Sequence, residues 1–345
     1  MSWVEAELRE QPDALERLIA AEEEHAVALR DELLRDDVRY LLIASRGSSG
    51  NAARYAQYLF AMANQLPTAF ATPSVYTLYD TAPRLDGALA IAISQSGKSP
   101  DVVAVLTEAR RQGRPTLAIT NDPSSPLAQA AEWTLCLHAG EERAVAATKT
   151  YLNSLGAVAL LSAAFTGERE RVRELREMPA LVRAQVEASL ADAARLDSYS
   201  DVESGSVVAR GINYGTAFEI ALKVRELSGI PFEPWSPPDL LHGPIAALKR
   251  GRPVIFVAPS GRALGSMVET IAKVRERGPE AIVISDDDDV LAAADTALPL
   301  VGSTPEWLSP LLSVVPGQAA AVRLATLRGI DVDRPLGLTK VTLTR

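Results

Sequence analysis

Two short serine-rich loops carry the residue types that bind phosphate. Residues 94–99 read Ser-Gln-Ser-Gly-Lys-Ser, and residues 47–49 read Gly-Ser-Ser. Each loop follows an apolar run and precedes a helical pattern, so its hydroxyl and N–H groups gather at a helix N-terminus, which favours anions. For one loop alone, a serine N-cap explains the pattern equally well. Two such loops after neighbouring strands favour phosphate binding. Lys98 either adds a positive charge to this site or simply extends into solvent. Neither loop matches the P-loop or the dinucleotide-binding pattern.

A second set of residues has the spacing of a helix. Glu219, Lys223 and Glu226 are four and three residues apart, so they share one helix face. Taken alone, they are most simply a surface stripe of ion pairs. His242 stands between an apolar pair and Gly-Pro, and it follows Glu226 closely enough for a loop to fold back over the helix. Lys340, near the end of the sequence, is in isolation a solvated lysine.

The elements that must position these residues alternate between strands and helices. Buried strands are expected at 40–44, 88–93, 115–120 and 133–137, with helical stretches between them. Continuous apolar strands alternating with helices indicate a parallel sheet covered on both faces. In such sheets, ligands bind beyond the carboxyl ends of the strands, where the serine-rich loops lie.

The same pattern then occurs a second time. The runs 206–211, 253–260 and 281–285 resemble the first, second and third strands of the earlier set together with their loops. A charged helical stretch, 168–202, reads as the connector between the copies. Two copies of one α/β unit are therefore predicted, with a first domain over 1–196 and a second over 197–345.

Composition excludes several classes of protein. The 345-residue chain has a net charge of −9 at pH 7, which argues against nucleic-acid binding. Cys136 is the single cysteine, which fits a reducing cytosol, and three histidines are too few for a His- or Cys-rich metal site. The most apolar stretch, 155–165, is shorter than the ~18 residues that span a membrane, and the acidic start shows no signal peptide. We expect a cytoplasmic protein without a metal or redox cofactor. We assign no function to Cys136 and His25 and expect a structural role for His138.

Together these pieces resemble the family of double sugar-isomerase (SIS) domain proteins, which includes the isomerase half of glucosamine-6-phosphate synthase and stand-alone glucosamine-6-phosphate deaminases. The resemblance covers nearly the whole chain. The matching pieces, in their shared order, are 10–12, 94–97, 145–149, 221–226, 241–244 and 329–335 with Lys340. It implies two doubly wound, flavodoxin-like parallel-sheet domains in tandem.

The resemblance also implies a role for each matching position. Glu226 would move a proton between C1 and C2 of a hexose 6-phosphate, while His242, contributed by the partner subunit of a homodimer, would assist ring opening. Lys340 would lie at the carbonyl end of the open-chain sugar, and Lys223 would stabilise developing charge. The substrate-binding positions would be Gly47, Ser48, Ser49, Ser94, Gln95, Ser96, Ser99, Val145 and Ala146. An aldose–ketose shift needs such a carboxylate base, a proton donor and nearby cations.

Departures from the family pattern narrow the expected reaction. The sequence begins Met-Ser-Trp, without the glutaminase domain of the synthase and its N-terminal cysteine, so we expect that glutamine is not the nitrogen source here. Residues 98–101 replace the usual acidic residue after the serine-rich loop, and Pro238-Asp239 replaces a Gly-Glu pair. The loop at 46–49 and the stretch 96–101 look more like the deaminase branch.

The preferred hypothesis is hydrolytic deamination of glucosamine 6-phosphate to fructose 6-phosphate and ammonia. Two enzymatic alternatives keep the fold: a plain phosphosugar isomerase, and a deglycase acting on a fructosamine phosphate. An alternative of another class is a non-catalytic sugar-phosphate sensor. A sensor needs the serine-rich loops but not Glu226, His242 and Lys340 together, so their joint presence favours an enzyme.

Overall fold

The computed structural model describes residues 1–35, 37–335, 337 and 340, and these residues form two compact units. The first-sheet unit contains residues 11–142, 149–177 and Lys340. The second-sheet unit contains residues 1–10, 143–148, 178–335 and 337. The domain boundary that we predict between residues 196 and 197 stays a prediction.

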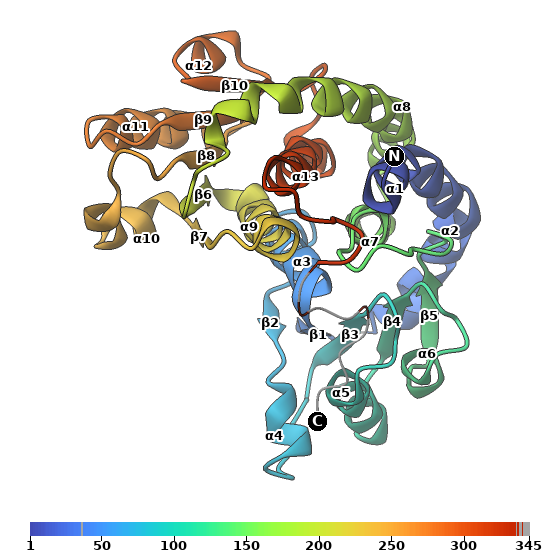
Figure 1. Cartoon of the computed structure of the whole chain (residues 1–345). Helices are drawn as coiled ribbons and strands as arrows, with labels where there is room; N and C mark the ends of the chain where they lie inside the picture. The colour runs from blue at the N-terminus through green and yellow to red at the C-terminus, as the bar shows by residue number, and fades with distance from the viewer. Residues whose placement is uncertain (36, 336, 338–339, 341–345) are drawn as a thin grey trace. The chain divides into compact units, whose positions relative to one another are not determined.

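The first-sheet unit is built on a parallel sheet with the strand order β2-β1-β3-β4-β5 (Figure 1). Its strands are β1 (Tyr40–Ser45), β2 (Thr68–Phe70), β3 (Ala88–Ile93), β4 (Thr116–Thr120) and β5 (Trp133–Cys136). From β1 the chain passes to the edge strand β2 and then crosses back to β3 on the other side of β1. The carboxyl ends of β1 and β3 therefore form the point at which the winding reverses, where ligands bind in such sheets.

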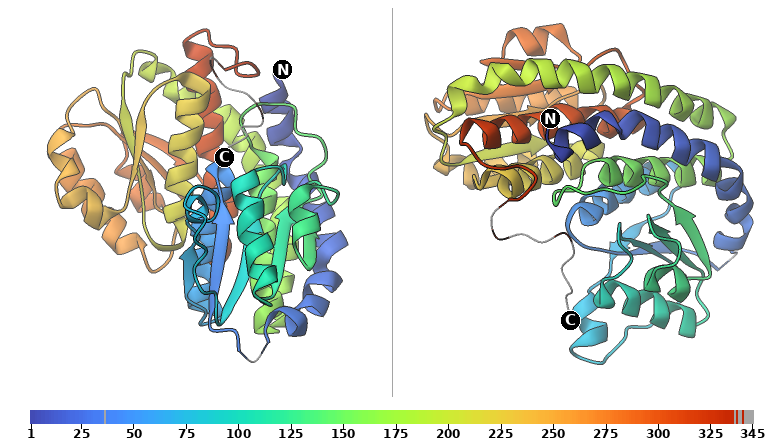
Figure 2. Two further views of the ribbon diagram at one scale, coloured as in Figure 1. Left: turned by 90° about the horizontal axis from the view of Figure 1, so that it is seen from below. Right: turned by 45° about the vertical axis from the view of Figure 1, so that its right-hand side comes forward.

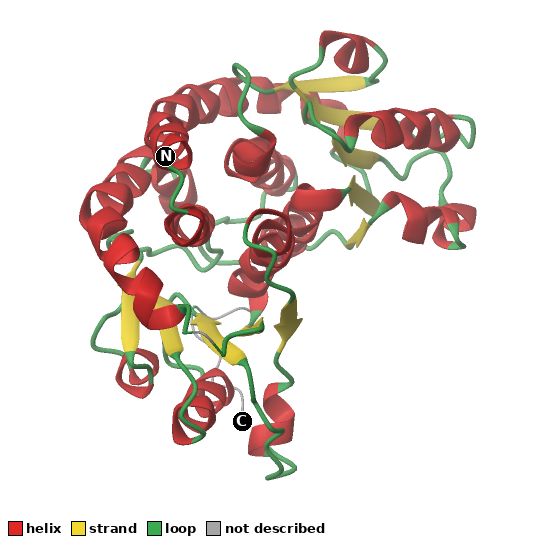
Figure 3. Ribbon diagram, turned by 180° about the vertical axis from the view of Figure 1, so that it is seen from behind, coloured by secondary structure: helices red, strands yellow, loops and turns green. Residues whose placement is uncertain are grey.

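Helices cover both faces of this sheet (Figure 3). They are α2 (Gln11–Leu33), α3 (Gly47–Ala63), α4 (Pro73–Thr77), α5 (Pro100–Arg111), α6 (Pro126–Ala130), α7 (Lys149–Thr166) and the first part of α8 (Arg169–Asp192). The alanines of β3 at 88, 90 and 92 pack in one apolar cluster with Val105 and Leu106 of α5, whereas Leu89 and Ile91 face the other side. Helix α7 is buried over nearly its whole length and lies against α2 (Figure 2), so the apolar stretch 155–165 is a core helix.

The second-sheet unit repeats this topology. Its parallel strands have the order β10-β9-β8-β6-β7, which is again the doubly wound order 5-4-3-1-2. They are β6 (Gly205–Ala209), β7 (Phe232–Trp235), β8 (Val254–Val257), β9 (Ala281–Ser285) and β10 (Thr296–Pro299). The α-helices wholly within this unit are α1 (Trp3–Arg9), α9 (Tyr214–Ser228), α10 (Pro237–Leu241), α11 (Leu264–Arg275), α12 (Asp288–Ala292) and α13 (Ser309–Leu327). Its 3-10 segments are η1 (Ala193–Tyr199), η2 (Gly211–Asn213), η3 (Pro244–Ala247) and η4 (Glu306–Leu308). The predicted pair of doubly wound α/β domains is confirmed.

Close packing of α13 against α9 fixes the helix that carries Glu226. A Cβ atom at Gly317 of α13 would overlap the side chain of Ile220, so only glycine allows the two helices to approach this closely. Helix α9 ends at a left-handed glycine, Gly229, whose N–H bonds to the Arg225 carbonyl. The helix is thus held along its length and at its end.

Among the described residues, the segment Glu306–Leu327 is long and apolar enough to cross a membrane by length and composition alone. Its most apolar window has a mean hydropathy of 1.2, but 83% of that window is buried inside the structure. A core helix of a folded domain has the same properties, so this segment is weak evidence for a membrane span.

Candidate active site

The first serine-rich loop is the opening turn of a helix. Strand β1 leads through Arg46 directly into α3, which starts at Gly47 with a φ of +52°. Ser48 and Ser49 therefore lie in the first turn of α3, where backbone N–H groups have no partner within the helix. The loop 47–49 is thus part of the helix rather than a segment before it, and this brings both hydroxyls to the helix N-terminus.

The second loop is a tight turn closed by its own hydroxyls. The Gly97 N–H donates to Ser94 Oγ at 3.2 Å, and the Lys98 N–H donates to Ser96 Oγ at 3.3 Å. Ser99 occupies the N-cap position of α5, but its hydroxyl makes no capping hydrogen bond. The hydrogen bond from a helix N–H to the Ser99 hydroxyl, which would make Ser99 a helix cap, is therefore not formed. The Lys98 side chain is exposed.

An ion pair between a half-exposed arginine and a buried aspartate joins the two loops. Arg46 donates from Nε at 2.9 Å and from Nη2 at 2.6 Å to Oδ2 of Asp101, whose side chain is 3% exposed. Arg46 directly precedes Gly47, and Asp101 stands in the first turn of α5, so the pair fixes the loop after β1 relative to the loop after β3. The first-sheet unit thus brings the predicted phosphate-binding residues to the winding reversal of its sheet.

Replacement of Gly97 by alanine is expected to damage this turn. Gly97 has a φ of +61°, and a Cβ there would lie 2.5 Å from Ser125 Cβ. We expect a loss of about 1–3 kcal/mol in the free energy of unfolding, together with weaker hexose-phosphate binding. Gly113→Ala is the matched control, because Gly113 has a φ of +70° but no neighbour within 4 Å. Denaturant unfolding and a binding titration on both variants test this, and equal losses in the two would contradict it.

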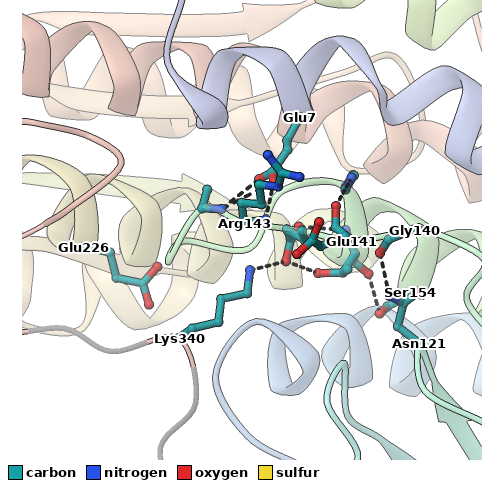
Figure 4. Close-up of polar contacts among 12 residues, drawn as sticks. Glu7, Asn121, Gly140, Glu141, Arg143, Ser154, Glu226 and Lys340 are labelled. Carbon is teal, nitrogen blue, oxygen red and sulfur yellow. Dashed lines mark hydrogen bonds and ion pairs between the residues drawn. The ribbon is translucent and has the colours of Figure 1, made fainter.

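Lys340 is held by a buried carboxylate that the sequence analysis missed. Its Nζ donates to Glu142 Oε2 at 3.0 Å, and the Glu142 side chain is fully buried. Figure 4 labels Lys340 and marks this contact by a dashed line from its ammonium. Glu142 also accepts bonds from Thr150 at the start of α7, from its N–H at 3.1 Å and from its hydroxyl at 2.8 Å. Lys340, 27% exposed, is therefore fixed against the N-terminus of α7 rather than solvated.

The helical set of charges is buried. Lys223 is 1% exposed, and its ammonium lies 3.6 Å from Oε1 of Glu219, which is fully buried, while it also pairs with Glu226. The interpretation of these residues as a surface stripe is therefore wrong. Glu226 differs from the other two because 25% of its side chain stays exposed. One buried ammonium thus holds a carboxylate that keeps access to solvent.

The predicted backbone contacts, Val145 and Ala146, lie in a segment of the second-sheet unit that α1 anchors. The backbone N–H groups of Arg143 and Ala144 both donate to the carboxylate of Glu7, as Figure 4 shows for Glu7 and Arg143. Ala146 is 1% exposed. Glu7 was not identified from the sequence, because nothing local to α1 indicates a partner so distant along the chain.

His242 belongs to another element of the second-sheet unit than the α9 carboxylates. It caps the C-terminus of α10 and lines a cavity with Arg210 and Lys273. The other two histidines, as expected, have structural partners: His138 Nε2 and His25 Nδ1 contact the buried Glu22 at 2.6 and 2.8 Å. Within the described residues, no group of three or more His, Cys, Asp or Glu side chains is placed to hold a metal ion.

The two units differ in one pair of corresponding loops, the loop after β3 in the first-sheet unit and the loop after β8 in the second-sheet unit. In the second-sheet unit, Glu306 Oε1 accepts the Arg262 N–H at 2.9 Å, and Asp286 Oδ1 accepts the Ser260 N–H at 2.6 Å. Carboxylates of the chain itself thus occupy the donors of this loop. The corresponding loop of the first-sheet unit, residues 94–99, closes on serine hydroxyls. The buried carboxylate of Asp101, in the first turn of α5, accepts the Val102 N–H and pairs with Arg46.

Comparison with known proteins identifies the family. The model of the SIS domain matches the chain twice, over residues 33–164 and 199–328. The glutamine–fructose-6-phosphate aminotransferase (isomerizing) of Thermus thermophilus is 34% identical over 349 residues, which cover 97% of this chain and 57% of that protein. The chain therefore spans little more than half the length of this relative.

Solved structures agree with this assignment. A structure from Silicibacter pomeroyi DSS-3, described as a phosphosugar isomerase, is 32% identical, with a TM-score of 0.84 over 96% of this chain and 100% of that chain. Glucosamine-6-phosphate deaminase from Thermotoga maritima has a TM-score of 0.78 at 22% identity, over 99% of this chain and 100% of that chain, which shows a shared fold alone. With two domain matches in tandem and both sheets wound in the expected order, the chain belongs to the SIS-domain family.

Proposed function

We propose that this protein is a phosphosugar aldose–ketose isomerase acting on a hexose 6-phosphate. The observation that carries the proposal is the arrangement on α9, where buried Lys223 holds the partly exposed carboxylate of Glu226. A surface ion pair would leave the lysine in water, whereas this one is withdrawn from it and its carboxylate partner remains accessible. A positioned carboxylate of this kind is the base that a proton transfer between neighbouring carbons requires.

The proposed roles follow the chemistry of each group. The serine-rich loops bind the phosphate, and Val145 and Ala146 contribute backbone contacts to the sugar. His242 of the partner subunit in a homodimer protonates the ring oxygen as the ring opens. Glu226 then removes the proton from one of C1 and C2 and returns it to the other. Lys340 lies at the carbonyl end of the open chain, where its ammonium stabilises the negative charge that develops on the oxygen of the enediol. Lys223 is 1% exposed, so it keeps Glu226 in place instead of stabilising that charge directly, the role that the resemblance implied.

The finer proposal concerns the amino group. With glucosamine 6-phosphate, transfer of the C2 proton to C1 turns the aldehyde and amine of the open chain into a C1 hydroxyl and a C2 imine. Water adds to the imine carbon and ammonia leaves, which gives fructose 6-phosphate. The relatives that are aminotransferases of fructose 6-phosphate support an amino-sugar substrate, and the stretch 98–101 supports the deaminating direction. We place this reaction in the cytoplasm.

A substrate panel tests the proposal. Purified protein is incubated with glucosamine 6-phosphate, and fructose 6-phosphate and ammonia are assayed against a Glu226→Gln control. Equal amounts of both products support deamination. Interconversion of hexose 6-phosphates without ammonia supports the plain isomerase, and turnover of a fructosamine 6-phosphate alone supports the deglycase. Binding of a hexose phosphate without any turnover would contradict the proposal that the protein is an enzyme and would support the non-catalytic sugar-phosphate sensor.

Ser99→Ala is expected to raise KM without destabilising the fold. The Ser99 hydroxyl makes no capping bond, so its loss removes a hydrogen bond to the charged phosphate, worth about 1.5–3 kcal/mol, and raises KM roughly 10- to 100-fold. Ser2→Ala is the control, because the Ser2 hydroxyl does cap α1. That variant should lose about 1 kcal/mol of stability and keep its KM. Steady-state kinetics and thermal unfolding distinguish the two, and an unchanged KM in Ser99→Ala would remove the phosphate role.

A further inference from the structure

A cavity lies beyond the carboxyl edge of the second sheet, at its own winding reversal. In this sheet β6 stands between β7 and β8, so the chain winds outward in both directions from β6 and β8. Arg210 directly follows β6, and Ser266 lies in the first turn of α11, the helix after β8. Both line a cavity of about 290 Å³ that is closed on its other side by α10. The elements around it are labelled in Figure 1.

The cavity is lined by one face of α11. Ser266, Glu269, Thr270 and Lys273 are spaced three and four residues apart, so they form a single stripe. Pro237, Pro238 and Leu241 of α10 supply the apolar part of the lining, and His242 stands at its end. The two positive charges of Arg210 and Lys273 exceed the single negative charge of Glu269. The cavity is therefore positively charged, although the protein has a net charge of −9.

The internal repeat shows what is special about Arg210. Arg46 and Arg210 each follow the first strand of their sheet, and each precedes a glycine with a positive φ, +52° at Gly47 and +61° at Gly211. In the first-sheet unit the guanidinium is neutralised by the buried Asp101. In the second-sheet unit it donates to the hydroxyl of Ser266 instead. In the part of the chain that the structure describes, no carboxylate pairs with Arg210, so its charge stays available to the cavity.

We propose that this cavity binds a phosphate monoester that carries hydroxyl groups, such as a small sugar phosphate. The guanidinium of Arg210 and the ammonium of Lys273 bind the phosphate, and the imidazole of His242 adds a donor. The hydroxyl of Ser266 accepts from Arg210, so its hydrogen is available to a phosphate oxygen. Glu269 accepts hydrogen bonds from the hydroxyl groups of the ligand. The volume is at the small end of ligand pockets, which suits such a molecule.

This site is distinct from the serine-rich loops. It lies in the other unit, and its loop after β8 is already occupied by Glu306 and Asp286, so the anion is held by side chains rather than by backbone donors. It shares His242 with the proposed catalytic machinery. The two cations that bind the phosphate here, Arg210 and Lys273, have no role in the proposed mechanism, so binding at these two residues does not require the protein to be an isomerase.

The test is a titration with glycerol 3-phosphate at constant pH and ionic strength, followed by NMR of the histidine rings. The chain has three histidines, so the His242 resonance is assigned with a His242→Gln variant. The background is Ser96→Ala/Ser99→Ala, which weakens binding at the first-sheet loops. We expect a saturable shift of the His242 resonance, with the resonances of His25 and His138 unmoved.

Three variants in this background decide the outcome. Arg210→Gln and Lys273→Gln are each expected to raise the dissociation constant at least tenfold. Lys249→Gln, which removes an exposed lysine that does not line the cavity, is expected to leave it unchanged. Lys273 is an exposed residue, so its variant tests the proposal even if Arg210→Gln unfolds. An unmoved His242 resonance, or an equal dissociation constant in Lys273→Gln and Lys249→Gln, overturns the proposal.

Discussion

Glu226→Gln is expected to lower kcat about 10³-fold while KM changes little. Glutamine has the same shape but cannot accept the proton from carbon, and general-base catalysis by a positioned carboxylate contributes roughly 10²–10⁴-fold. The substrate contacts assigned to the serine-rich loops and to Val145 and Ala146 are untouched by this change. Steady-state kinetics on whichever hexose phosphate the substrate panel identifies measure both parameters.

Glu233→Gln is the matched control for that experiment. Glu233 is an exposed glutamate of β7 in the same unit, and the proposed mechanism gives it no role. It should keep the activity of the natural sequence. If Glu226→Gln retained more than a tenth of kcat, another group would have to be the base.

Lys223→Met is expected to lower the free energy of unfolding by about 3–5 kcal/mol, a large loss for a single substitution. Lys223 lies between two carboxylates, and Glu219 is fully buried, so removal of the ammonium takes away the counter-charge that stabilises a buried carboxylate. Methionine keeps most of the side-chain volume, which separates the loss of charge from the loss of packing. Chemical denaturation of the two proteins measures the difference.

A double variant isolates the electrostatic cause. When Glu219→Gln is added to Lys223→Met, the buried negative charge disappears and part of the stability should return. A double variant no more stable than Lys223→Met alone would show that packing, not charge, explains the loss. Lys223→Met and the double variant should both have low activity, because Glu226 lacks in each the cation that holds it.

The central strands and the edge strand β5 could be predicted from the sequence, whereas the other three edge strands could not. Strands β1, β3, β4, β8 and β9 are continuous apolar runs, since both faces of each are covered. Strands β2, β7 and β10, which the sequence analysis missed, have three or four residues and lie at or near the sheet edges, and β7 contains Pro234. At an edge, one side of the strand needs no partner, so neither length nor hydrophobicity marks it.

The sequence supplies candidate residues for the site but not the contacts that hold them in place. Spacing places Glu219, Lys223 and Glu226 on one face of α9, but it does not say that the face is buried. That depends on α13, whose Gly317 allows close contact from almost a hundred residues away. Glu142, which holds Lys340, is 198 residues away from it in the sequence, so no local pattern indicates their contact.

The repeat itself explains why one half of the protein would bind the substrate phosphate. The two units share strand order and the Arg-Gly turn after their first strand, so topology alone gives each a ligand crevice. Side chains near each crevice then make the two crevices chemically different. Glu306 and Asp286 accept the N–H groups of the loop after β8, whereas the loop after β3 closes on serine hydroxyls. Duplication would thus have supplied two crevices with different chemistry.

The central claim is that Glu226 moves hydrogen along the carbon chain of a hexose 6-phosphate, and an isotope at the reacting carbon tests it directly. Glucosamine 6-phosphate and glucose 6-phosphate, each carrying deuterium at C2, are incubated with the protein and followed by NMR. The account predicts that deuterium leaves C2 in at least one of them, either to C1 or to water, and that it stays in place with Glu226→Gln. Deuterium that remains at C2 of both sugars, or that leaves equally fast with Glu226→Gln, would contradict the account.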